Sequence, residues 1–231
     1  ICFGHRGAMG YEPENTLSSF NKAVEMGADG IELDVYKSSD NHVIVSHSDA
    51  LEIEGQRYRI TKLTLEDIKQ INLPKDQTIP TLGEVFEEME KKTSGKLLYS
   101  IDLKDVRFAD LYLDVLKSHD VEQRVFTCLE SRLFIKKVWK KEPSCQFVYS
   151  TRADEEGELG DLHKIKPEMI SVVNMPHYEI TERIISAVHE KGLKMFAWDV
   201  NDVEDMQKVA TWDVDGVYSN YPDTLLEIIK N

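Results

Sequence analysis

The sequence alternates between short apolar runs and helix-like segments along nearly its whole length, and this alternation constrains the fold most. Eight of the apolar runs suit parallel strands, and they lie at about residues 2, 30, 98, 125, 146, 170, 194 and 216. Strand–helix alternation to a count of eight in 231 residues is typical of a closed (β/α)₈ barrel. We therefore predict an α/β fold of this type, a single barrel domain over residues 1–231 without a linker.

One further apolar run, at about residues 43–47, does not fit the alternation. Only a polar turn from Ser38 to Asn41 separates it from the strand at about residues 30–36. A crossover to a parallel strand needs roughly a dozen residues or more, so we predict an antiparallel hairpin return. This return brings His47 back beside the preceding strand. The polar residues 48–63 that follow are expected to form an excursion loop.

Two carboxylates interrupt the apolar strand Gly30-Ile31-Glu32-Leu33-Asp34-Val35. Side chains two residues apart on a strand point to the same face, so Glu32 and Asp34 lie side by side. Adjacent acids repel each other unless they share a partner, and a divalent cation such as Mg²⁺ or Ca²⁺ suits two hard oxygen donors. On this stretch alone, the end of a sheet with two solvated acids is an equally good interpretation.

The strand at residues 97–104 repeats the pattern, because Asp102 and Lys104 also share a face. A charge pair within one strand is the alternative interpretation. In a (β/α)₈ barrel, however, the carboxyl ends of all strands open onto one face, where active sites lie. The chemically versatile side chains collect at or just past strand ends, and they are His5, Arg6, Glu32, Asp34, Asp102, Lys104 and Trp198. This segregation favours a functional site on that face.

Composition excludes several classes of function. The formal charge is −14, from 28 basic and 42 acidic residues, which argues against binding nucleic acid over a broad surface. No apolar stretch of 18 residues exists, so we predict no membrane span. Cys2, Cys128 and Cys145 match no metal or redox spacing and are expected to be buried thiols. A leader is not visible and a cytoplasmic protein is favoured, while the sequence does not indicate the oligomeric state.

Several motifs taken together resemble the glycerophosphodiester phosphodiesterase family, whose barrel is related to those of phosphatidylinositol-specific phospholipase C and sphingomyelinase D. The opening block matches in order and spacing, with His5-Arg6-Gly7, Pro13-Glu14-Asn15-Thr16, Glu32-Leu33-Asp34 and His47. Ile101-Asp102-Leu103-Lys104 is similar to the family's acid-x-Lys strand. Ala197-Trp198-Asp199-Val200-Asn201 and Asp215-Gly216-Val217-Tyr218-Ser219-Asn220-Tyr221-Pro222 are similar to its later motifs. The match covers nearly the whole chain.

This resemblance implies metal-dependent hydrolysis of glycerophosphodiesters to an alcohol and glycerol 3-phosphate. It assigns Glu32, Asp34 and Asp102 to one divalent cation, Mg²⁺ or Ca²⁺. His5 and His47 become the acid/base pair, since the reference pKa of histidine, about 6.5, serves either role near neutrality. The substrate-binding residues are Arg6 and Lys104 for the phosphoryl oxygens and Trp198 as an apolar wall. Glu14 is expected beneath the metal, and His177 beside the pocket.

The chain departs from the family pattern at three positions. Ser48 follows His47 where an Asp is usual, Asp102 replaces a Glu, and Asp199 replaces a Thr. An Asp-x-Lys pair also occurs in sphingomyelinase D, so lipid cleavage of the sphingomyelinase D or lysophospholipase D type is an alternative, although the polar loops 48–63 and 152–161 disfavour it. A catalytically inactive binding barrel and a different metal-dependent hydrolase on the same fold are further alternatives.

Overall fold

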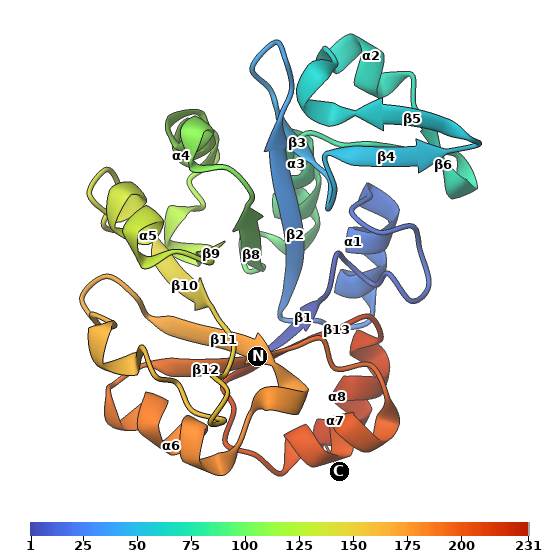
Figure 1. Cartoon of the computed structure of the whole chain (residues 1–231). Coiled ribbons are helices and arrows are strands. Elements are labelled where there is room, and N and C mark those ends of the chain that lie inside the picture. Colours follow the sequence, from blue (N-terminus) through green and yellow to red (C-terminus); the bar gives the residue numbers. More distant parts are fainter. Residues whose placement is uncertain (231) are drawn as a thin grey trace.

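Eight parallel strands close into a barrel in the computed structural model, which describes residues 1–230 (Figure 1). Around the barrel the strands follow the order β1 (Cys2–Gly4), β13 (Gly216–Ser219), β12 (Lys194–Trp198), β11 (Val172–Pro176), β10 (Gln146–Ser150), β9 (Val125–Leu129), β8 (Leu98–Leu103) and β2 (Gly30–Lys37). Pairing of Phe3 with Gly30 between β1 and β2 closes the ring. The predicted barrel and its eight strands are confirmed, with β11 beginning two residues later than expected.

Amphipathic helices cover the outside of the barrel, and each turns a buried apolar face toward the strands. They are α1 (Leu17–Glu25), α3 (Leu82–Thr93), α4 (Ala109–Ser118), α5 (Arg132–Trp139), α6 (Glu182–Glu190), α7 (Val203–Ala210) and α8 (Pro222–Lys230). Capping boxes fix the start of α1 at Thr16 and of α3 at Thr81. Within residues 1–230, only a 3₁₀ turn at Leu162–Lys164 lies between β10 and β11.

Aromatic side chains fill the lower interior of the barrel. The ring of Phe3 stacks on Tyr218 with 5.1 Å between centroids and lies 5.7 Å from Phe196 and 5.9 Å from Phe126. Inward-facing positions recur every second residue along a strand. The next inward layer therefore stands above this apolar floor and opens at the carboxyl ends of the strands. That layer is mostly polar or ionisable, with Glu32, Ser100, Cys128, Ser150, Asn174 and Trp198.

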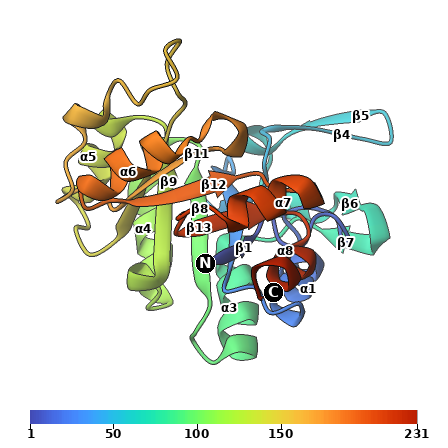
Figure 2. The same cartoon turned by 90° about the horizontal axis from the view of Figure 1, so that it is seen from below.

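The predicted return strand is present as β3 (Val43–Val45), which pairs antiparallel with the end of β2. The prediction for residues 48–63 is wrong, because this segment is a β-hairpin rather than a loop. It consists of β4 (Ala50–Ile53) and β5 (Gln56–Arg59), and Figure 2 shows the hairpin extending away from the barrel. Its turn residues Glu54 and Gly55 both have positive φ, 51° and 77°, as a tight two-residue hairpin turn requires.

Five isoleucines form a small separate core that holds the hairpin and the following segments to β3. The hairpin leads into α2 (Leu65–Lys69), whose N-cap is Thr64, and into a short ladder of β6 (Asn72–Leu73) with β7 (Gln77–Thr78). The buried members of this core are Ile44, Ile60, Ile68, Ile71 and Ile79. The insertion therefore has apolar packing of its own between β3 and α3.

Two further predictions concern the cysteines and membrane-spanning helices. Cys2, Cys128 and Cys145 are buried free thiols, as expected. In the part of the chain that the structure describes, no helix is both long and apolar enough to cross a bilayer.

Gly7, in the turn after β1, is expected to be intolerant of a side chain. Its φ is +80°, and a Cβ would lie 2.4 Å from Oγ of Ser19 and 2.5 Å from its carbonyl carbon. Gly7→Ala should lower the free energy of unfolding by about 2–5 kcal/mol, from roughly 1–2 for the left-handed backbone plus 1–3 for overlap. Urea denaturation measures the change.

Gly55→Ala is the matched control for this measurement. Gly55 has nearly the same φ, +77°, but a Cβ there meets no atom within 4 Å. It should therefore cost only the backbone contribution of roughly 1–2 kcal/mol. Equal losses in the two variants would contradict the argument that contact with Ser19 makes Gly7 necessary.

Candidate active site

One pocket of about 180 Å³ lies at the carboxyl ends of the barrel strands, and it is lined by all eight side chains that the sequence predicts for the site: His5, Arg6, Glu32, Asp34, His47, Asp102, Lys104 and Trp198. The pocket is also lined by side chains that were not predicted to belong to the site, which are Ser100, Cys128, Glu130, Ser150, Asn174 and Tyr218. Alternation along the strands places four of these six, since Ser100, Cys128, Ser150 and Asn174 each follow an inward-facing residue by two positions.

Three carboxylates form the centre of the pocket. Parallel pairing of β2 with β8 sets Asp34 opposite Asp102 and Glu32 opposite Ser100. One oxygen from each of Glu32, Asp34 and Asp102 lies within 4.8 Å of the others. Glu32 and Asp34 are only 7% and 2% exposed. Three hard oxygen donors at this spacing fit a divalent cation, because Mg²⁺ and Ca²⁺ take carboxylate oxygens.

Donors from three segments hold the carboxylates in place. The Arg6 backbone N–H donates to Glu32 at 2.9 Å, and Nδ2 of Asn15 donates to Asp34 at 3.1 Å. Nζ of Lys104 lies 2.6 Å from Asp34 and 3.0 Å from Asp102. Nε of Arg6 lies 3.7 Å from Asp34, and within residues 1–230 this buried atom has no hydrogen-bond partner. The cluster is thus oriented by donors but holds more negative charge than these cations neutralise.

Burial and mutual repulsion shift the pKa values of these acids. The pKa of Glu32 is raised well above its usual value by burial, and Asp34 and Asp102 raise it further. Burial also raises the pKa of Asp102, although Lys104 opposes the rise. Burial opposes the charge on Lys104, yet Asp102 and Asp34 raise its pKa. A cation that enters between the carboxylates therefore lowers the free energy of the cluster.

The two imidazoles approach the cluster from separate segments. Nδ1 of His5 lies 2.7 Å from Oδ1 of Asn220, just past β13, and Nε2 lies 3.9 Å from Glu32. An amide oxygen only accepts, so Nδ1 carries the proton and Nε2 keeps its lone pair toward the pocket. Burial, followed by the charge of Arg6, lowers the pKa of His5.

The return strand places His47. The Ser46 N–H donates to the Asp34 carbonyl at 2.9 Å, which extends the β2–β3 pairing to the residue before His47. His47 is exposed at the pocket mouth. Burial of part of the ring lowers its pKa; Asp34 opposes this shift, and Arg6 and Lys104 add to it. An imidazole at this position can exchange protons with solvent.

Glu14 contacts the site through Arg6: its side chain is 40% exposed and accepts a hydrogen bond from Nη1 of Arg6 at 2.8 Å. One weaker expectation is wrong. His177 is not among the residues that line the pocket, and its Nε2 lies 3.2 Å from Asp205. Trp198 does line the pocket, and the guanidinium of Arg152 covers its ring at 5.4 Å from the centroid.

The departures from the family pattern have structural consequences here. Asp49, one place later than the usual Asp, binds Arg59 at 2.8 Å and the Thr61 N–H at 2.9 Å, so it supports the hairpin. Asp199 accepts a hydrogen bond from Nδ2 of Asn201 at 2.7 Å, and Oδ1 of Asn201 accepts from the Asn220 N–H at 2.8 Å. Asp199 thereby supports the residue that orients His5.

Comparison with known proteins shows the family of the chain. The profile of the Glycerophosphoryl diester phosphodiesterase family matches residues 5–224, nearly the whole chain. The chain belongs to this family. Members of the family depend on divalent cations, which agrees with the acidic cluster of Glu32, Asp34 and Asp102.

Individual family members match the chain from end to end. A glycerophosphodiester phosphodiesterase of Caldanaerobacter subterraneus is 27% identical over 246 residues, covering 100% of this chain and 98% of that protein. The solved glycerophosphodiester phosphodiesterase of Thermotoga maritima has a TM-score of 0.83 and 27% identity, with 99% and 97% coverage. A phosphodiesterase of Oleispira antarctica, solved with its product sn-glycerol-3-phosphate, has a TM-score of 0.88 at 23% identity, with 100% and 96% coverage.

The raised pKa of Glu32 predicts how stability responds to pH and metal. The folded protein holds the Glu32 proton more tightly than the unfolded chain, so metal-free stability should fall as pH rises from about 4.5 through the raised value. Divalent cation should restore it, by about 2.7 kcal/mol at 100 times Kd. At pH 8, Glu32→Gln should raise the metal-free melting temperature and reduce the gain on adding Mg²⁺ or Ca²⁺.

Thermal denaturation with chelator and with each cation, at pH 5 and pH 8, measures both effects. Glu87→Gln on the outer face of α3 makes the same charge change at an exposed site and should alter neither. A wild-type protein whose melting temperature at pH 8 is indifferent to Mg²⁺ and Ca²⁺ would contradict the assignment of the cluster.

Proposed function

We propose that this protein hydrolyses glycerophosphodiesters to sn-glycerol 3-phosphate and an alcohol. The observation that carries the proposal is the meeting of three carboxylates, two imidazoles and two cationic side chains in one pocket, in a chain of this family. The product held by the Oleispira antarctica relative supports the glycerol phosphate end of the substrate. A pocket of about 180 Å³ suits a small diester group rather than a bulky one.

Glu32, Asp34 and Asp102 are the residues that would hold one divalent cation, Mg²⁺ or Ca²⁺, through carboxylate oxygens. When bound, such an ion supplies positive charge that neutralises the phosphodiester and stabilises charge on the phosphoryl oxygens in the transition state. Lys104 and Arg6 line the same pocket beside the acids, and they act as fixed donors to those oxygens.

His5 is assigned as the general base and His47 as the general acid. The contact of Nδ1 of His5 with Asn220 turns Nε2 toward the pocket, so Nε2 accepts the proton of the attacking hydroxyl. His47, at the exposed mouth, donates a proton to the leaving alkoxide and is reprotonated from solvent. The attacking group is either the glycerol's own hydroxyl, with a cyclic phosphate that water then opens, or water directly. Both routes use the same two imidazoles.

A second candidate is cleavage of lysophospholipids, and one observation favours it. Large apolar side chains are exposed where segments follow β9, β11 and β12: Leu133 at 78%, Phe134 at 49%, Tyr178 at 65% and Val203 at 50%. These residues lie outside the polar loops 48–63 and 152–161, from which the sequence disfavours lipid cleavage. They offer scattered apolar contacts for an acyl chain. An inactive barrel has less support, since no proposed catalytic or metal position has been lost.

Loss of either imidazole should abolish most activity without unfolding the protein. His5→Ala and His47→Ala should each lower kcat on sn-glycero-3-phosphocholine by about 10²- to 10⁴-fold, the usual contribution of general acid or base catalysis. Choline release measures the rate, and stabilisation by divalent cation should persist because the carboxylates remain. His163→Ala removes an exposed imidazole and serves as the control.

Lysophosphatidylcholine is the second substrate in the same assay. It shares the headgroup and adds one acyl chain, so the ratio of kcat/KM separates the two candidates. A ratio that favours the small diester supports the proposal, and strong preference for the lipid would overturn it. Undiminished hydrolysis by His47→Ala would contradict the assignment of the acid.

A further inference from the structure

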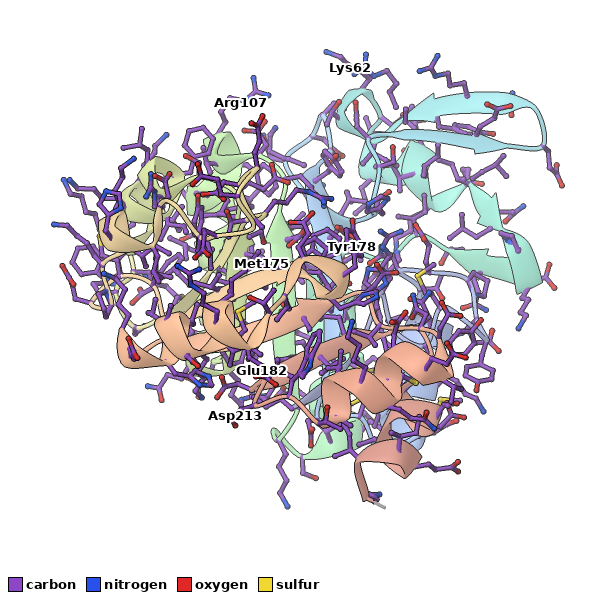
Figure 3. The ribbon with its side chains drawn as sticks, turned by 60° about the horizontal axis from the view of Figure 1, so that its bottom comes forward. Lys62, Arg107, Met175, Tyr178, Glu182 and Asp213 are labelled. Carbon is purple, nitrogen blue, oxygen red and sulfur yellow. The ribbon has the colours of Figure 1, made fainter. Side chains whose placement is uncertain are left out.

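A basic groove adjoins the active-site pocket. It has a volume of about 780 Å³, within the range of ligand-binding clefts, and shares Lys104 with the pocket. The groove lies between the inserted hairpin, with the 3₁₀ turn at Ile60–Lys62 that follows it, and the 3₁₀ turn at Val106–Phe108 before α4. Figure 3 shows Lys62 and Arg107, one from each wall, at the same end of the molecule.

The charge of the groove is opposite to that of the protein. Its lining contains five basic side chains, Lys37, Arg59, Lys62, Lys104 and Arg107, and two acidic ones, Asp49 and Asp105. The whole chain has 28 basic and 42 acidic residues. A surface with a net charge of −14 would repel an anion almost everywhere, so this groove is a local exception.

Among residues 1–230, two of these cations, Lys37 and Lys62, have no acidic partner. Asp49 binds Arg59, and Asp105 binds Arg107, so both acids of the groove are already used. Nζ of Lys37 donates only to the Ser38 carbonyl and to Asn41 at 2.8 Å. Lys62 makes no ion pair or hydrogen bond through its side chain with any residue from 1 to 230. Lys37 and Lys62 therefore keep their charge free for a ligand.

We propose that this groove binds a second anionic group, phosphate or carboxylate, on the alcohol half of the substrate. The inference rests on the proposed function and adds to it a substrate class: glycerophosphodiesters whose alcohol is itself negatively charged. With the reacting phosphate beside Lys104, the alcohol leaves the pocket along the groove toward Lys62. The two free ammonium groups then attract its charge, while Arg59 and Arg107 line the walls.

The test compares three diesters with alcohols of different charge: glycerophosphocholine, glycerophosphoinositol, and glycerophosphoinositol 4-phosphate. The wild type should have its highest kcat/KM on the last. The double variant Lys37→Gln/Lys62→Gln should lower that value by roughly 3- to 30-fold through KM, the size expected for two exposed charge contacts. Glycerophosphocholine, whose choline carries a positive charge, should lose no kcat/KM in this variant, and added salt should reduce the preference for the phosphorylated diester.

Lys91→Gln/Lys166→Gln is the matched control, because it removes two exposed lysines elsewhere with the same change in net charge. Equal wild-type kcat/KM on the charged and uncharged inositol diesters would overturn the groove assignment and leave the hydrolase intact. An equal loss in the control variant would likewise overturn it. Absence of hydrolysis of all three diesters would instead overturn the proposed function.

Asn174 supports a second inference, which is independent of the groove. It lies on β11 two positions after the inward-facing Val172, and its side chain lines the pocket although it is only 5% exposed. Its buried Oδ1 has no partner, and no hydrogen bond among residues 1–230 uses its amide nitrogen. A buried polar group without a partner is costly, commonly by about 1–3 kcal/mol, and needs an explanation.

The surroundings of Asn174 limit what its partner can be. Ser150 of β10 and Phe196 of β12 are its partners in the sheet, and Trp198, two positions after Phe196, lines the same pocket. The charged side chains of the cluster lie on β2 and β8, across the mouth of the barrel. A carboxamide both donates and accepts, which matches a hydroxyl rather than a phosphate. The match to a hydroxyl is the same if the oxygen and nitrogen of the Asn174 carboxamide are interchanged.

The geometry points to Asn174 as a specificity-determining residue that binds a hydroxyl of the glycerol moiety. This inference also rests on the proposed function. Asn174→Ala should lower kcat/KM for glycerophosphocholine by about 5- to 150-fold, the loss of one hydrogen bond to a buried group. Hydrolysis of bis(p-nitrophenyl) phosphate, which has no hydroxyl, should change less than about threefold.

Thermal denaturation separates this role from a structural one. Because the variant removes an unpartnered polar group, its melting temperature should match or exceed that of the wild type. A clear fall in melting temperature, or an equal loss of kcat/KM on both diesters, would overturn the assignment. A wild type inactive on both diesters would overturn the proposed function itself.

Discussion

The active site depends on one electrostatic constraint, which is that three carboxylates must be kept close together in a largely buried place. The β2–β8 register brings Asp34 opposite Asp102, and the alternation of β2 adds Glu32 on the same face. Neighbouring segments supply compensation through the Arg6 backbone, Asn15 and Lys104. This compensation is incomplete, so the pocket has an affinity for positive charge before any substrate arrives.

The fold and the charged half of the site could be predicted because both depend on patterns that are local in sequence. Apolar runs separated by helix-like segments determine the barrel, and the spacing of Glu32 and Asp34 determines their common face. The carboxyl ends of parallel strands meet on one side whatever their order, so Asp102 and Lys104 could be added without knowing any distance. The family resemblance then supplied roles that spacing alone leaves open.

The unpredicted features depend on contacts between distant segments or on weak signals. The hairpin of β4 and β5 has a Glu-Gly turn in place of the more usual Asn-Gly, and its strands are too polar to show clear alternation. Asn174 and Ser150 are neutral polar residues within apolar strands; alternation gives each the same face as the residue two positions before it, and the closed barrel shows that this face lines the pocket. Asn220 gains importance solely from its contact with His5, 215 residues away.

The contact between His5 and Asn220 joins two segments that are far apart in the sequence. His5 follows the first strand and Asn220 the last, and these strands are adjacent only once the ring of β-strands is complete. The orientation of one reactive imidazole is therefore a product of the whole fold rather than of any part of it. A nascent or truncated polypeptide that has formed the acidic cluster but not yet received β13 would leave the His5 imidazole unaligned, so the pocket should be complete only once β13 closes the barrel.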